Sequence, residues 1–405
     1  MTALTAKELV PPGWVGLKRP AHGYWQFSVY QNEEILPRGE SVRYPAIAIP
    51  VLSLLLSTSL AQAAAKTDEI GRIVRAEMEK QHIPGLALLV SRNGVPIREQ
   101  GFGLASVELD VPVMPKTIFQ SGSVGKQFTA TAVMLLVEEG KIGLNDPLLK
   151  YFADGPGWWS EVTIRELLSH TAGFTDYPKD FDLRKDYSEA ELLKMVEAIP
   201  AAYPPGTGWA YSNLGYVILG ILIHRVSGQY FGDFLQDRVF KPLGMSTTRI
   251  IDEADIIPNR AAGYRLDNGQ LKNQEWVSPS ANSTADGSLY FTILDLAKWD
   301  AALYTDKVLK ESSKREMWTV ATLRDGKPNP GPYGFAWFVD SRNGHRLVGH
   351  GGRWQGFTTH IARYLDDGLT IVILTNQGNC DPQRIVDEVA AIYFKGNIRN
   401  LKAIR

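Results

Sequence analysis

Cysteine is nearly absent from this chain of 405 residues, and its absence excludes several kinds of structure. Because Cys380 is the single cysteine, the chain can form no internal disulfide and no metal site built from several thiolates. The seven histidines show no spacing typical of metal ligands, so we expect no metal site. The formal net charge is only −1, which provides no basic field for nucleic acid and argues against it as a partner.

The sequence also lacks a convincing membrane span near its start. The apolar run at residues 44–60 is interrupted by Pro50 and is short for a membrane-spanning helix. Arginines precede it, and an alanine-rich stretch at residues 61–65 fits an A-x-A cleavage pattern. This order predicts a cleaved export signal over residues 42–65, and hence a periplasmic or secreted protein. The alternatives are an uncleaved anchor, which would be the protein's only contact with a membrane, and a buried core helix.

The rest of the chain favours an α+β fold. Near its start, the Asn93-Gly94 pair is a strong hairpin signal between two short apolar segments, and later segments alternate between helix and strand patterns. Capping signals at Thr163, Ser188 and Thr292 mark helix starts. The predicted helices are 67–81, 128–137, 163–168, 188–198, 214–226, 230–240, 292–303 and 382–394, and the predicted strands are 86–90, 95–100, 333–339, 346–350, 358–364 and 369–375.

Strands from both ends of this order can pair into one antiparallel sheet, with the N- and C-terminal helices packed on it. The middle of the chain then forms an inserted all-helical lobe, roughly residues 120–305. We therefore predict one folded domain over residues 66–395, followed by a short tail at 396–405. Residues 1–41 show no sustained hydrophobic period and stay unassigned.

The first sign of chemistry is the pair Ser123 and Lys126, because no other serine in the chain has a lysine three residues later. Residues at i and i+3 are neighbours on a helix, so the two side chains would share one face. The run from Phe128 to Val137 is apolar almost all round, which indicates a buried helix that ends near Gly140. A lysine buried there can lose its proton and activate the serine. A capping serine beside a surface lysine is the alternative.

Two further motifs stand far along the chain. Tyr211-x-Asn213 follows a Pro/Gly-rich loop and begins an apolar helix; the tyrosine could relay a proton and the asparagine could hold a substrate carbonyl. A core tyrosine with a capping asparagine is the alternative, and Ser280-x-Asn282 is a weaker competitor for the same role. His350-Gly351-Gly352 is predicted to end a strand, where glycines would let a substrate backbone approach closely.

Together, Ser123-x-x-Lys126, Tyr211-x-Asn213 and His350-x-Gly352 resemble the serine β-lactamase and penicillin-binding-protein superfamily. The resemblance is closest to its branch of class C β-lactamases, D,D-carboxypeptidases, D-aminopeptidases and related esterases. It runs from about residue 67 to 395 and includes the stretch from Leu167 to Phe174. It implies a sheet lobe and a helical lobe of the β-lactamase/transpeptidase type, with the site in the cleft between them.

The resemblance also implies roles for individual residues. Ser123 would be the acyl-enzyme nucleophile, and Lys126 with Tyr211 would be the proton-transfer pair. The backbone N–H groups of Ser123 and Arg353 would form an oxyanion hole, worth roughly 3 kcal/mol each in acyl transfer. No metal or cofactor is required. The residues expected to bind substrate are Asn213, His350, Gly352 and Arg353.

We therefore expect an exported serine hydrolase that acts on a small-molecule or peptide substrate. It would form an acyl-enzyme on Ser123 and hydrolyse a peptide, amide or ester, as a D,D-peptidase, D-aminopeptidase or esterase does. The sequence has no Lys-Thr-Gly, and His350 would be mostly neutral at neutral pH. This argues against a class C-like β-lactamase, although Arg353 could anchor a substrate carboxylate instead.

Two other interpretations stay open at this point. One is a non-catalytic binder of cell-wall peptides on the same fold, which would have no need of all three of Ser123, Lys126 and Tyr211. The other is an α/β-hydrolase, which is disfavoured because a Gly-x-Ser-x-Gly elbow is absent. His170 is expected to brace a loop rather than to serve in a catalytic triad. The sequence does not define the oligomeric state.

The long segment before the export signal leads to a first prediction. No methionine lies between Met1 and Met78, so we hypothesise that translation starts at a non-Met codon such as that of Val42 and that residues 1–41 are not translated. N-terminal sequencing of the protein from its native host would contradict this by finding residues 1–41 attached.

Overall fold

The computed structural model describes residues 69–252 and 254–401 of the chain. The unassigned segment at 1–41 and the predicted export signal at 42–65 lie outside the described residues. Within the described part, no helix combines the length and apolar character needed to cross a membrane.

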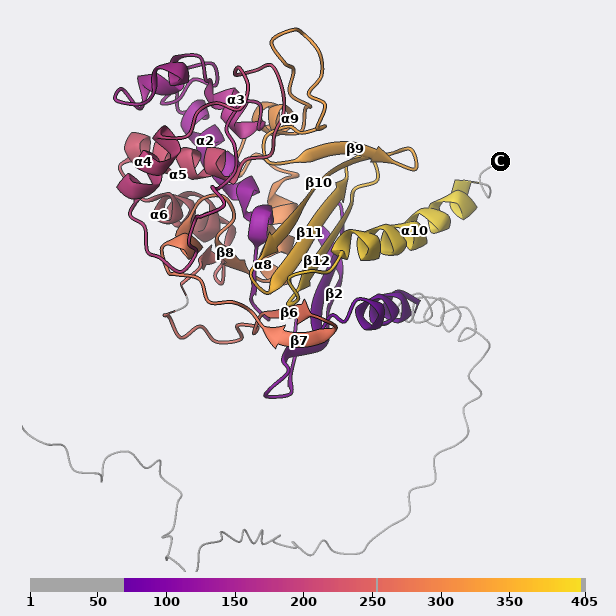
Figure 1. Cartoon of the computed structure of the whole chain (residues 1–405). Coiled ribbons are helices and arrows are strands. Elements are labelled where there is room, and N and C mark those ends of the chain that lie inside the picture. The colour runs from indigo at the N-terminus through magenta and orange to yellow at the C-terminus, as the bar shows by residue number, and fades with distance from the viewer. Residues whose placement is uncertain (1–68, 253, 402–405) are drawn as a thin grey trace, which may run out of the picture. The chain divides into compact units, whose positions relative to one another are not determined.

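One seven-stranded antiparallel sheet joins the two ends of the folded domain (Figure 1). Its strand order is β3-β2-β1-β12-β11-β10-β9. β12 is the central strand and pairs with β1, and their register runs from Leu86↔Thr375 to Arg92↔Leu369. The pairing of early and late strands is therefore confirmed. The strands are β1 (Gly85–Arg92), β2 (Val95–Ser106), β3 (Val111–Pro112), β9 (Phe338–Arg342), β10 (His345–Trp354), β11 (Phe357–Tyr364) and β12 (Leu369–Thr375).

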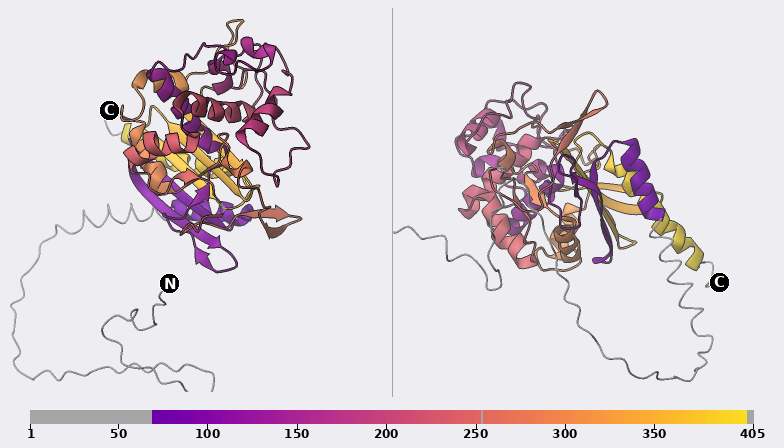
Figure 2. Two further views of the ribbon diagram at one scale, coloured as in Figure 1. Left: turned by 90° about the vertical axis from the view of Figure 1, so that its left-hand side faces the viewer. Right: turned by 90° about the horizontal axis from the view of Figure 1, so that it is seen from below.

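The central strands bury both of their faces, because helices cover the sheet on each side. Successive side chains of a strand point to opposite faces. In β1, Leu86, Leu88 and Val90 pack in the core that contains the helix at residues 69–80 and α10 (Pro382–Leu401). Ala87 and Leu89 belong instead to the larger core shared with the middle of the chain. Figure 2 shows the two terminal helices together on one side of the sheet and the helical lobe on the other.

The middle of the chain forms the predicted lobe, and its buried centre is α2 (Lys126–Glu138), which packs against α5 (Asn213–Ser227). α2 ends as expected, with Gly140 in the left-handed conformation at φ +72°. The predicted caps Thr163, Ser188 and Thr292 are confirmed. They begin the helices α3 (Ile164–Leu168), α4 (Glu189–Glu197) and α8 (Ile293–Ala302).

The lobe is not all-helical, which corrects part of the prediction. It contains a small sheet of β4 (Phe119–Gln120), β8 (Leu289–Phe291) and β5 (Arg249–Ile250). A hairpin of β6 (Tyr264–Asp267) and β7 (Gln270–Asn273) comes from the same range of the chain but lies at the end of the main sheet, where Tyr264 N donates to Asn376 O (Figure 1). These strands are only two to four residues long, too short to show a period. The hairpin turn is Asn268-Gly269, the same signal as Asn93-Gly94, with both residues at positive φ.

Three further predictions about helices and strands were wrong in detail. The helix expected at 230–240 is α6 (Phe231–Leu235) followed by a π-helical turn at Gln236–Phe240 and the short α7 (Lys241–Leu243). The strand expected at 333–339 begins only at Phe338, because the chain turns at Ala336, where φ is +64°, and Tyr333, Phe335 and Trp337 are all buried in the core around this turn. A short helix, α9 (Glu311–Met317), was not predicted, and α10 extends to Leu401, into the expected tail.

α8 is held on the sheet by a buried ion pair. It packs against β1, β2 and β12 on the lobe side. Asp300 of α8 accepts from Arg363 Nε of β11 at 2.8 Å, and the two side chains are 0% and 2% exposed. Thr370 of β12 donates to the same carboxylate at 2.8 Å. The pair therefore joins a helix to two strands.

We predict that Asp300→Ala destabilises the fold by about 3–5 kcal/mol, because it leaves the Arg363 cation buried without its partner. The half-exposed pair of Arg342 and Asp387, which is joined at 2.7 Å, is the matched control. Asp387→Ala should cost about 1 kcal/mol or less. Urea unfolding of the three proteins measures the difference, and equal losses for both variants would contradict the prediction.

Candidate active site

Ser123 lies on a tight turn that comes just before α2. The turn is η1 (Gly122–Gly125), a 3-10 helix, and α2 continues it from Lys126. Gly122 has φ +51°, a conformation that favours glycine. β10 runs directly beside the turn, since a Cβ on Gly122 would lie 2.5 Å from Arg353 N. The first and third motifs are therefore in backbone contact.

The ammonium group of Lys126 is the polar centre of the site. Its Nζ donates to Ser123 Oγ at 3.2 Å, to Asn213 Oδ1 at 2.6 Å and to the backbone oxygen of Asp286. The side chain is fully buried. Burial lowers the pKa of Lys126 to about 8, while the charges of Asp286 and Asp176 oppose that shift. A fraction of neutral amine near neutral pH is the form that can accept the Ser123 proton.

Tyr211 and Asn213 stand at the start of α5, where Ser212 caps the helix. Lys126 Nζ is 5.0 Å from the centre of the Tyr211 ring. The Tyr211 hydroxyl is buried and has no well-aligned hydrogen-bond partner among the described residues, although it faces Ser123. Burial raises the pKa of Tyr211 far above its ordinary value, so the phenol stays neutral and can pass a proton only as a relay.

His350 lies inside a strand and not at the end of one. β10 continues to Trp354, so the prediction that the strand ends at this motif was wrong. His350 Nε2 is 2.9 Å from the Tyr333 hydroxyl, and Nδ1 is 2.6 Å from Gly351 O. Burial, reinforced by the charge of Lys126, lowers the pKa of His350 to about 3. The direction of this shift agrees with the expectation that His350 is neutral near pH 7.

The two glycines after His350 have different surroundings. A Cβ on Gly352 would lie 2.2 Å from Ser121 O and 3.0 Å from Ser123 N, whereas a Cβ on Gly351 would meet His360 Nδ1 at an ordinary 3.4 Å. Only glycine at position 352 lets the nucleophile turn pack on β10. Gly352 thus has a role in assembling the site, besides any approach by a substrate.

Six of the seven residues predicted for the site line one cavity of about 500 Å³, and Lys126 lies beside it in contact with Ser123 and Asn213. The cavity also has walls that the sequence did not reveal, because they come from distant loops and strands. Asp176 comes two residues after the stretch from Leu167 to Phe174 that resembles the family. This closeness is the one sequence signal that could have predicted its place in the site. The further lining residues include Phe338, His360, Cys380, Asp381 and Gln383.

Asp176 fixes the orientation of the asparagine. Its carboxylate accepts from Asn213 N at 3.2 Å and from Asn213 Nδ2 at 3.1 Å. The amide oxygen is thereby left to face Lys126. Within residues 69–252 and 254–395, no three His, Cys, Asp or Glu side chains gather in a way that could hold a metal ion.

The competing candidates have structural roles, although the His170 ring packs against the Tyr211 ring with their centres 4.3 Å apart. Ser280 Oγ accepts from Tyr187 N at 2.8 Å, and Asn282 Oδ1 accepts from Trp354 Nε1 at 2.6 Å, so this pair is used in loop packing. His170 Nδ1 accepts from Ser212 N at 3.2 Å, just before α5. Burial lowers the pKa of His170 well below its ordinary value. The prediction that His170 braces a loop is confirmed.

Comparisons with known proteins agree with this geometry. The family described as Beta-lactamase matches residues 70–392. Penicillin-binding protein 4* of Bacillus subtilis is 30% identical over 317 residues, which cover 74% of this chain and 69% of that protein. Unguisins hydrolase ungD' of Aspergillus campestris is 29% identical over 335 residues, covering 76% of this chain but only 61% of that protein.

Solved structures show the same fold. The octameric penicillin-binding protein homologue of Pyrococcus abyssi aligns with a TM-score of 0.70 at 26% identity, covering 82% of this chain and 77% of that one. The D-amino acid amidase of Ochrobactrum anthropi SV3, complexed with L-phenylalanine amide, aligns with a TM-score of 0.73 at 23% identity, covering 82% of this chain and 99% of that one. The predicted α+β architecture is confirmed. Since the family match spans nearly the whole described region, the chain belongs to the beta-lactamase family of serine hydrolases.

Proposed function

We propose that the protein hydrolyses small amides, peptides or esters through an acyl-enzyme on Ser123. The observation that carries this proposal is the contact of Ser123 Oγ with Lys126 Nζ at 3.2 Å, beside an open cavity of about 500 Å³. A lysine whose pKa is about 8 is a competent base close to neutral pH.

In the proposed acylation step, neutral Lys126 takes the proton of Ser123 while Oγ attacks the substrate carbonyl carbon. The backbone N–H groups of Ser123 and Arg353 lie on touching segments, which would let both address the same oxyanion. The neutral hydroxyl of Tyr211 would then relay that proton from the Lys126 ammonium to the leaving group, as the C–N or C–O bond of the substrate breaks. Water hydrolyses the acyl-enzyme and regenerates Ser123. Asn213, held by Asp176, would orient both the base and the substrate.

The charges around the cavity favour an amide or ester over a β-lactam as substrate. β-Lactams carry a carboxylate, and His350 is neutral, so it offers no cation to bind one. Asp176 and Asp381 add negative charge to the wall. Similarity to the D-amino acid amidase, which was solved with a phenylalanine amide, supports an aminoacyl amide as a candidate substrate.

β-Lactam hydrolysis is the second candidate, and one observation favours it. Arg353 is an exposed cation at the cavity wall, where it could bind a substrate carboxylate.

Export to the periplasm or the medium is also part of the proposal, on the evidence of the predicted signal at residues 42–65. Sequencing the N-terminus of the mature protein would test whether that signal is removed.

We predict that a fluorophosphonate probe labels the wild-type protein and not Ser123→Ala. Labelling should accelerate as the pH rises through about 8, because Lys126 is protonated below its pKa and cannot then accept the serine proton. Lys126→Met should slow labelling by about 10²–10⁴-fold, whereas the exposed Lys150→Met should leave it unchanged. If the wild type is neither labelled nor active on any ester or amide, the protein is a binder and not an enzyme.

A substrate panel separates the two candidates. We expect the kcat/KM for D-aminoacyl anilides and short p-nitrophenyl esters to exceed that for a chromogenic cephalosporin. Arg353→Gln should raise the KM of the cephalosporin by about tenfold, the usual worth of one charged contact, and should leave the KM of the uncharged esters nearly unchanged. If the cephalosporin has the highest kcat/KM of the panel, β-lactam hydrolysis becomes the better-supported function and the prediction is contradicted.

A further inference from the structure

Asp286 is a buried carboxylate beside the site that the proposed mechanism does not use. It lies in the loop between η5 (Ala281–Ser283) and β8, and only 7% of it is exposed. Tyr177 Oη lies 3.4 Å from Asp286 Oδ2, and the backbone oxygen of Asp286 accepts from Lys126 Nζ. Burial raises the pKa of Asp286, and the charge of Lys126 opposes that rise. An ionised carboxylate is costly to bury unless a cation lies near it.

The other ionisable groups that surround Lys126 are neutral near pH 7. His170, from the loop after α3, and His350, from β10, both have a pKa lowered by burial and by the charge of Lys126. Tyr211 and Tyr216, at the start of α5, present their rings to Nζ, and burial raises the pKa of both. The charges that act on Lys126 are therefore those of two carboxylates, Asp286 and Asp176.

The two carboxylates differ in their exposure to water. Asp176 is exposed and acts on Lys126 through Asn213, so solvent and salt screen its charge. Asp286 is buried, where the lower dielectric strengthens any interaction with Lys126. Of the two, Asp286 has the larger effect on the pKa of Lys126.

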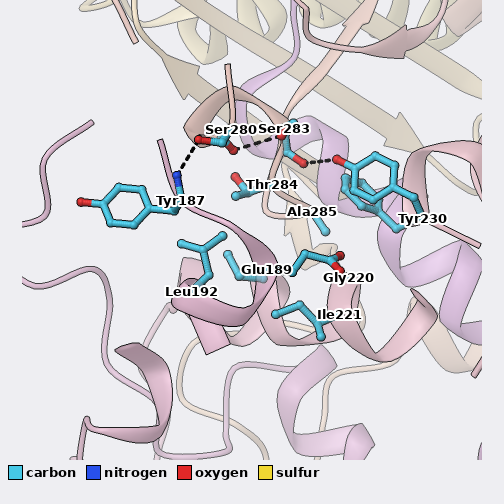
Figure 3. Close-up of a pocket in the computed structure, with 12 residues that line it drawn as sticks. Tyr187, Glu189, Leu192, Gly220, Ile221, Tyr230, Ser280, Ser283, Thr284 and Ala285 are labelled. Carbon is cyan, nitrogen blue, oxygen red and sulfur yellow. Dashed lines mark hydrogen bonds between the residues drawn. The ribbon is translucent and has the colours of Figure 1, made fainter. Parts of the chain in front are cut away.

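The residues just before Asp286 are held by hydrogen bonds to the helical lobe, which Figure 3 shows. Tyr230 donates to Ser283 O, and Ser280 Oγ accepts from Tyr187 N. The pocket lined by these residues has a volume of only about 50 Å³, enough for a few water molecules and too small for a substrate. We take this region as packing that positions the loop.

The same segment is also fixed by the catalytic elements. Thr129 of α2 donates to Ala285 O at 2.7 Å. A Cβ on Gly287 would lie 2.4 Å from Gly122 O, so the residue after Asp286 packs directly on the nucleophile turn. Asp286 therefore has little freedom to move relative to Lys126.

We propose that Asp286 is a positioning residue that acts through Lys126: its backbone oxygen, which accepts from Nζ, and its buried carboxylate together hold the ammonium beside Ser123. The inference rests on the proposed function insofar as Lys126 is the base. It concerns an equilibrium property of Lys126, however, and this can be measured without any substrate.

The test is a ¹³C NMR titration of the full chain labelled at lysine Cε, with the Lys126 resonance assigned by its loss in Lys126→Met. In the wild type the midpoint should lie at about pH 8. In Asp286→Asn it should fall by about one pH unit, because removing the negative charge destabilises the ammonium. An unmoved midpoint in Asp286→Asn would overturn the inference, whether or not Ser123 is labelled by the acylating probe.

Matched variants separate charge from packing. Asp286→Glu keeps the charge and should return the midpoint close to the wild-type value, while Asp176→Asn should shift it by less than Asp286→Asn does. If the enzyme turns over a substrate, the acid limb of kcat/KM in Asp286→Asn should move to lower pH. If the role of Asp286 is purely structural, Asp286→Asn should lower kcat/KM at every pH without moving the acid limb.

One measurement needs no variant at Asp286 and covers the case in which Asp286→Asn fails to fold. The wild-type midpoint should change little between 0.05 M and 0.5 M salt (about 10-fold in ionic strength), because salt screens a buried pair poorly. A midpoint that falls steeply with added salt would mean that the exposed Asp176 governs Lys126, and would overturn the role of Asp286.

Discussion

The buried ammonium of Lys126 is the group on which the organisation of the site depends. Removing a charged amine from water is unfavourable, and the surrounding chain compensates with oxygens from three separate segments, those of Ser123, Asn213 and Asp286. Because the compensation is incomplete, the pKa of Lys126 falls to about 8 and the residue becomes a usable base. The same contacts that stabilise the buried lysine therefore place it beside the nucleophile.

The sheet and the lobe contribute different parts of this arrangement. β10 supplies a straight backbone edge on which η1 rests, and Gly122 and Gly352 remove the side chains that would hold the two apart. The lobe supplies α2 and α5, two apolar helices whose first residues are Lys126 and Asn213. Polar groups thus gather at helix ends, where the core opens into the cavity, and the remainder of each helix is buried.

Local patterns in the sequence predicted much of the fold and most of the site. The apolar runs of β1, β12 and α2, the Asn93-Gly94 turn and the capping residues acted over short ranges and were found where expected. Longer-range effects were missed. Tyr333, Phe335 and Trp337 alternate as strand residues do, yet they follow a turn into the core, because packing against distant residues outweighs local propensity.

By itself the sequence determined which residue types were available for chemistry: a serine and a lysine one helical turn apart, a Tyr-x-Asn pair, and a histidine followed by two glycines. It could not say that Asp176 orients Asn213, that the backbone oxygen of Asp286 contacts Lys126, or that Gly352 serves backbone packing. Those relations join residues that are 37 to more than 150 positions apart in the chain. Only the tertiary structure decided them, because burial and charge depend on what the folded chain brings together and not on sequence spacing.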